Sequence, residues 1–134
     1  MADLLIVDNL ILTRIKNKTA SKLGSKYSSL TIKYTNNDRE LLEPTFPTVF
    51  VKQLQTRAIG ETFDGGINAG DFTFQVDVYD NSSQTRAKDI LKAIIAVMTD
   101  MYFTLATFPI FDNTTNVYRA TARFTRVIGA SDKL

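Results

Sequence analysis

Three aspartates near the middle of the chain are the residues best suited by type to metal binding or acid–base chemistry. They are Asp71, Asp77 and Asp80. Asp71 and Asp77 fall on the same side of an alternating apolar and polar run, but six residues of strand separate them by about 20 Å. Unless a bulge intervenes, that distance excludes a shared ion or proton, so solvated strand positions are the preferred interpretation. We therefore expect no catalytic residue, no metal site and no cofactor.

Composition narrows the chemistry further, because the 134 residues include neither histidine nor cysteine. Ser-His-Asp and Cys-His catalysis, disulfides, thiolate metal sites and the usual zinc ligands are excluded. Carboxylate chemistry and carboxylate-bound magnesium stay open. A net charge of +2 is too small to imply nucleic-acid or membrane binding by itself. No apolar run approaches the ~20 residues that span a bilayer, and the first residues lack signal-peptide features. We expect a protein made in the cytoplasm, without a membrane partner.

One glycine-rich segment invites comparison with a phosphate-binding loop. It reads Gly65-Gly66-Ile-Asn-Ala-Gly70. It lacks the lysine and Ser/Thr of a Walker motif and does not lead from a strand directly into a helix. We interpret residues 60–70 as an extended surface loop or a bulged hairpin tip, in which the glycines permit positive φ.

The first quarter of the chain carries a block of positive charge, with no acidic residue between Asp8 and Asp38. Its members are Arg14, Lys16, Lys18, Lys22, Lys26 and Lys33. Contact with DNA or with an acidic partner is one interpretation. A solvated helix face with snorkelling lysines is the other, and it is preferred because no aromatic stacking platform is visible beside the charge.

Three arginines near the C-terminus are candidates for a protein interface. Arg119 and Arg123 fall on one face of an alternating run, with Arg126 close by. The forked guanidinium suits an interface on a threonine-rich sheet face. Cross-strand pairing with Asp77 or Glu61 inside the monomer is an equal alternative.

The elements that must position these residues follow from hydrophobic periodicity. Residues 3–23 read as an amphipathic helix, with Asp3 able to cap it and Gly24 at its end. Alternation predicts strands at 30–35, 48–54, 72–79 and 118–128, and a second helix capped by Ser82 or Ser83 that runs to about Tyr102. Residues 104–110 read as a short strand or loop broken at Pro109, and 112–116 as a turn.

Two details of the last strand bear on packing. Its apolar period slips near Arg126, which indicates either a bulge there or burial of both faces at its end. Ala120 and Ala122 leave room for the second helix to pack close.

The order of these elements predicts a single α+β domain, an antiparallel or mixed sheet of about four strands flanked by two helices in the order α-β-β-β-α-β.

Four segments in this order resemble the tail-completion, or tail-terminator, proteins of long-tailed bacteriophages and prophages. They are Phe46-Pro-Thr-Val-Phe-Val-Lys52, Thr73-Phe-Gln-Val-Asp-Val-Tyr-Asp-Asn81, Met98-Thr-Asp-Met-Tyr-Phe103 and Tyr118-Arg-Ala-Thr-Ala-Arg-Phe-Thr-Arg-Val-Ile-Gly129. The resemblance covers nearly the whole chain. The basic helix near the N-terminus is a departure from it.

The resemblance implies a non-enzymatic virion protein that forms a ring, a hexamer in this family, at the head-proximal end of the tail tube. Such a ring stops tube polymerisation and binds the neck, or connector, protein; viral DNA only passes through its hole. By analogy, the candidate interface residues are Glu61, Phe63, Asp64, Ile67, Asn68, Arg119, Arg123 and Arg126. The alternatives are another neck or tail-tube subunit, or a small nucleic-acid-binding protein that uses the basic block.

Overall fold

The computed structural model describes residues 6–37, 39, 45–54, 56–61, 67–129 and 132, with the backbone alone at 59–61, 67 and 68. The described elements are α1 (Val7–Leu23), η2 (Ser25–Tyr27), β1 (Lys33–Thr35), β2 (Thr48–Gln53), β3 (Arg57–Glu61), β4 (Ile67–Asp80), α2 (Gln84–Asp100), β5 (Thr104–Thr114) and β6 (Val117–Gly129). The chain is α+β, as predicted. The described part holds two α-helices and a six-stranded mixed sheet, in the order α-β-β-β-β-α-β-β, so the prediction of about four strands was too low.

The long strands β4 and β6 form the centre of the sheet, whose order is β1-β2-β4-β6-β5. β1 is parallel to β2, and the other pairs are antiparallel. The predicted pairing of 72–79 with 48–54 is confirmed, with Val51 opposite Val76. The two strands do not form a simple hairpin, because β3 lies between them in the chain and pairs with the first part of β4.

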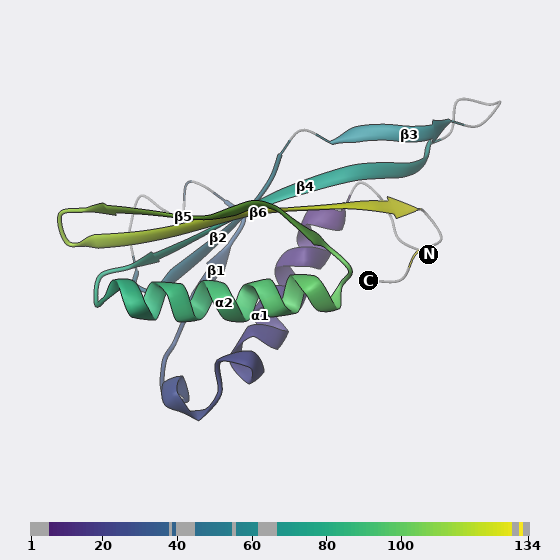
Figure 1. Ribbon diagram of the computed structural model, residues 1–134. Coiled ribbons are helices and arrows are strands. Elements are labelled where there is room, and N and C mark those ends of the chain that lie inside the picture. The colour runs from purple at the N-terminus through teal and green to yellow at the C-terminus, as the bar shows by residue number, and fades with distance from the viewer. Residues whose placement is uncertain are drawn as a thin grey trace.

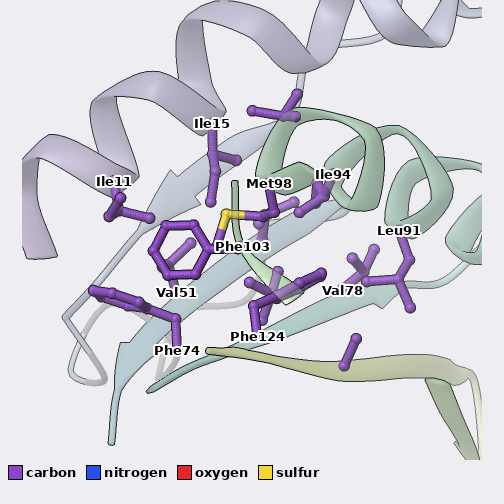
Figure 2. Close-up of a cluster of buried hydrophobic side chains, with 14 of the residues drawn as sticks. Ile11, Ile15, Val51, Phe74, Val78, Leu91, Ile94, Met98, Phe103 and Phe124 are labelled. Carbon is purple, nitrogen blue, oxygen red and sulfur yellow. The ribbon is translucent and has the colours of Figure 1, made fainter. Parts of the chain in front are cut away.

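Both helices cover one face of the sheet (Figure 1). Even-numbered side chains of β4 and β6 point into this layer, and Phe74, Phe124 and Ile128 are essentially inaccessible to solvent. The ring of Phe103 packs edge-on against Phe74, with centroids 5.8 Å apart, and Figure 2 places Met98 beside it. The hydrophobic core therefore lies between the two helices and the sheet.

The second helix packs as the sequence predicts. Ala120 and Ala122 of β6 are fully buried in the same cluster as the inward face of α2, which comprises Ala87, Ile90, Leu91 and Ile94. Ser83 is the N-cap, and its hydroxyl accepts a hydrogen bond of 3.0 Å from the Arg86 amide.

The first helix begins at Val7 and ends at Leu23, and the next residue, Gly24, has a φ of 77° that is easiest for glycine. Its buried residues repeat every four positions and are Val7, Ile11, Ile15 and Thr19, so the apolar face predicted for this helix is confirmed at the first three. The proposed cap Asp3 lies outside the described residues. The strand predicted at 30–35 is confirmed only over β1.

The segment at 104–110 is not a short strand broken at its proline. β5 runs through Pro109 as an edge strand, where a missing amide costs no central ladder bond. Register shifts on both sides of Thr107 accommodate the irregularity. The predicted turn at 112–116 shrinks to Thr115 and Asn116, with a φ of 66° at Asn116.

The bulge predicted near Arg126 is wrong. The register between β4 and β6 is continuous there, with Arg126 opposite Phe72 and Val127 opposite Asp71. Nor are both faces buried, because Val127 is 53% exposed. The apolar period is interrupted because a long charged side chain occupies a position on the helix side of the strand.

Of the segment 60–70, predicted as an extended loop or a bulged hairpin tip, the described residues 60–61 and 67–70 are strand, which favours the hairpin. β3 and β4 form an antiparallel hairpin in which Glu61 lies opposite Ile67, and Figure 1 shows the hairpin extending past the helices. Gly65 and Gly66 lie outside the described residues. Gly70 does not adopt a positive φ; it provides space, because a Cβ there would come 2.6 Å from the Phe72 ring.

Candidate assembly surfaces

The sheet face opposite the helices is the first candidate surface, and we call it the outer face. It carries the odd-numbered residues of the two central strands, which the antiparallel register sets side by side. They are Asp71, Thr73, Gln75, Asp77 and Tyr79 of β4, and Arg119, Thr121, Arg123, Thr125 and Val127 of β6. No helix of the described part of the chain covers this face in Figure 1.

The carboxylate of Asp77 is the centre of this polar surface, although the residue is only 3% exposed. The Thr121 hydroxyl donates to Asp77 Oδ1 at 2.7 Å, and Arg119 Nη2 lies 3.4 Å from Oδ2. Gln75 and Tyr79 donate longer bonds, at 3.3 and 3.4 Å. A buried charge of this kind is stable because several donors surround it.

The two outer-face arginines differ in how they are held. Arg119 pairs with Asp77 and lies over the Tyr79 ring, with 5.8 Å from its guanidinium carbon to the ring centroid, and its buried Nε has no partner among the described residues. Arg123 is exposed, and its Nε donates to Gln75 Oε1 at 3.0 Å. Pairing of Arg119 with Asp77 is thus confirmed, whereas the side chain of Glu61 is not described. Roles for Arg119 and Arg123 at a subunit interface stay predictions.

The third arginine lies on the opposite face. Arg126 points to the helix side, where its Nη1 donates to the Met101 carbonyl at 2.8 Å and its Nη2 lies 3.6 Å from Asp132. The structure therefore does not bring Arg126 together with Arg119 and Arg123, because the continuous register places even and odd residues on different faces.

The second candidate surface is the edge strand β5, none of whose residues was among the interface candidates predicted from the sequence. Phe108 is 83% exposed and Ile110 is 57% exposed, and we call this pair the apolar edge. Phe111 is partly covered by Lys88, whose Nζ lies 4.6 Å from the ring centroid. A long edge strand with exposed apolar side chains and unpaired backbone groups is a template for pairing with another chain. The only sequence signal was a run of apolar residues that also fits a buried strand.

The third candidate surface is the β3–β4 hairpin, which carries the remaining predicted residues. Glu61, Ile67 and Asn68 lie on its paired strands, but their side chains are not described. Phe63 and Asp64 lie outside the described residues. The hairpin and the apolar edge lie at opposite edges of the sheet. β3 pairs with the edge of β4 that faces away from β6, and β5 pairs with the edge of β6 that faces away from β4.

Two further findings concern metal ions and membranes. Across the part of the chain that the structure covers, no group of three or more acidic side chains is placed to hold a metal ion, and no helix is long and apolar enough to cross a membrane. Searches of known protein families and of curated proteins found no match to the chain.

Proposed function

We propose that this chain is a structural virion protein of a long-tailed bacteriophage or prophage, which caps the head-proximal end of the tail tube as a ring. The resemblance of its strands and second helix to tail-terminator proteins is the starting point. The ring ends tube polymerisation and forms the joint to the neck protein, and viral DNA passes through its hole. The chain would assemble in the host cytoplasm and remain in the virion.

The observation that carries this proposal is that two different candidate surfaces lie at opposite edges of one sheet. A closed ring needs a heterologous interface, in which one patch of a subunit meets a different patch of its neighbour. The apolar edge of β5 supplies one patch and the β3–β4 hairpin supplies the other. Phe108 and Ile110 are side chains that a monomer gains little by exposing and that a subunit contact would cover.

A neck or tail-tube subunit of similar fold is the alternative. It would also need a heterologous interface, so the shape of one subunit favours neither. The two functions differ in what happens to the tube when the protein is missing: a terminator's absence gives overlong tubes, and a tube subunit's absence gives none.

Mass in solution, measured by light scattering with and without the cognate tube protein, tests the ring directly. We expect ring-sized assemblies, alone or on tube ends, with interfaces burying roughly 1,200 Å² or more. Ile110→Ser should abolish them without lowering the melting temperature. Ile6→Ser is the matched control, because Ile6 is 44% exposed at the start of α1, far from β5 in sequence. A chain that stays monomeric under both conditions would contradict the proposal.

A further inference from the structure

A groove between the C-terminal parts of the two helices gathers positive charge, and we call it the basic groove. α1 contributes Arg14, Lys18 and Lys22, and the chain after α2 contributes Tyr102. Arg126 of β6 closes one side. The three α1 residues are spaced by four, so they follow one another along a single helix face at intervals of about 6 Å.

Tyr102 is displayed in this groove at a conformational cost. The Phe103 amide donates to the Met98 carbonyl at 3.0 Å and the Tyr102 amide to the Thr99 carbonyl at 2.9 Å, which together form a Schellman motif. Tyr102 occupies the left-handed position with φ of 64°, where glycine is usual. The residue is nevertheless 81% exposed, so burial does not compensate for the cost. Residues in unfavourable backbone conformations cluster at functional sites, so Tyr102 is a candidate ligand contact.

Arg126 gives the groove a fixed guanidinium beside the aromatic ring. Its guanidinium carbon lies 5.8 Å from the Tyr102 ring centroid, and its bond to the Met101 carbonyl anchors it. Only 15% of its side chain is exposed. Ring and guanidinium together form a platform on which a planar group can stack.

Two carboxylates offset part of the positive charge. Asp100 Oδ2 lies 2.8 Å from Lys22 Nζ, and Asp132 lies beside Arg126. Among the described residues, four cations and two carboxylates belong to this groove or lie beside it, so its described lining carries a net positive charge. The Lys22 pair is largely exposed, at 40% and 64%, so a ligand phosphate can replace Asp100 at little cost.

We propose that the basic groove binds single-stranded nucleic acid, with phosphates along Lys18 and Lys22 and a base stacked on Tyr102. A cationic track beside an aromatic platform is the arrangement that single-strand binders use. The sequence showed the basic block without an aromatic partner; the fold brings Tyr102 to it from a point about eighty residues further along the chain. This inference does not depend on the proposed virion function.

Fluorescence anisotropy with a short labelled oligothymidylate tests the site. The association constant should fall as the salt concentration rises. A plot of its logarithm against the logarithm of the salt concentration should have a slope of about −1.4 or steeper, as expected for two or more neutralised phosphates on a single strand. Tyr102→Asn, which suits a left-handed φ, should weaken binding about fivefold or more, and Tyr102→Trp should preserve it. Lys18→Glu should weaken binding and Asp100→Asn should strengthen it. Lys52→Glu on β2 is the control for the charge change and should leave affinity close to wild type.

Three results would overturn the inference. One is no binding at low salt by the folded wild-type chain. Another is equal loss with Lys52→Glu and Lys18→Glu, which would mean diffuse electrostatics. The third is full displacement of the oligothymidylate by an oligoglutamate of equal charge, together with unchanged oligothymidylate affinity in Tyr102→Asn. The groove would then be a binding site for an acidic peptide. Thermal melting of each variant separates lost binding from lost folding.

Discussion

The Thr121 hydroxyl donates a hydrogen bond to the Asp77 carboxylate across the two central strands, with 2.7 Å between Thr121 Oγ1 and Asp77 Oδ1. This bond lies on the face of the sheet that carries no helix, yet Asp77 is nearly inaccessible to solvent. The centre of the outer face is therefore an ordered polar cluster around Asp77, in which Thr121, Gln75, Tyr79 and Arg119 already donate hydrogen bonds.

Removing the carboxylate from this layer should destabilise the fold. Asp77→Ala leaves Thr121 and Arg119 without their shared acceptor, and we expect a loss of about 2–4 kcal/mol in the free energy of unfolding. Urea denaturation measures it. Asp112→Ala, at an exposed position on β5, is the control and should cost less than about 0.5 kcal/mol. Equal stabilities for the two variants would contradict the role given to Asp77.

The ion pair between Arg86 and Asp80 should matter more than those at the surface. Asp80 is fully buried, and Arg86 Nε lies 2.5 Å from its Oδ2. Arg86→Ala leaves that charge unpaired and should cost about 3–5 kcal/mol. Lys22→Ala breaks an exposed pair with Asp100 and should cost under about 1 kcal/mol. A similar drop in melting temperature for both variants would contradict the expectation that the buried pair stabilises the fold more than the exposed one.

Close packing of α2 on β6 predicts that Ala122 cannot be enlarged. It is fully buried beneath the helix, so Ala122→Phe should overpack the core and lower stability by about 1–3 kcal/mol. Thr104→Phe adds the same ring at an exposed position of β5 and should be nearly neutral. An unchanged melting temperature for Ala122→Phe would show that the helix does not pack there.

Ionisation of Tyr79 on the outer face should make the stability of the fold depend on pH in the alkaline range. Burial raises the pKa of its phenol, the Asp77 carboxylate raises the pKa further, and Arg119 lowers it. In the folded protein the pKa of Tyr79 lies above the ordinary value near 10. The neutral phenol therefore makes its full contribution to the stability of the fold below about pH 10, and this contribution is lost as pH rises through the folded pKa. Ultraviolet titration of the wild type against Tyr79→Phe measures this. A Tyr79 component that titrates at or below pH 10 would contradict the assignment.

Periodicity predicted the parts of the fold that bury a regular apolar face. The strand at Phe74, the strand at Phe124 and the helix through Ile90 were found because each alternates or repeats against one core. β3 was missed because it is short and ends beside glycines. β5 was predicted only as a short strand or loop broken at Pro109, because proline normally argues against a strand, and its place at the edge of the sheet removes that objection.

The candidate surfaces were predicted less well than the fold, for physical reasons. Arg126 was grouped with Arg119 and Arg123 because it is close to them in sequence, whereas the regular register of β6 places it on the opposite face. The exposure of Phe108 and Ile110 has no sequence signature, since an apolar residue reads the same whether a helix covers it or not. Tyr102 was taken as the last residue of a helix, and its place beside the basic block depends on tertiary contacts.

The most direct measurement of the central claim is the length of tail tubes seen by electron microscopy when the cognate phage assembles without this protein. The account predicts tubes that grow beyond their normal length and carry no heads, with normal length restored by the wild-type chain and not by Ile110→Ser. Tubes of normal length in its absence, or no tubes at all, would contradict it.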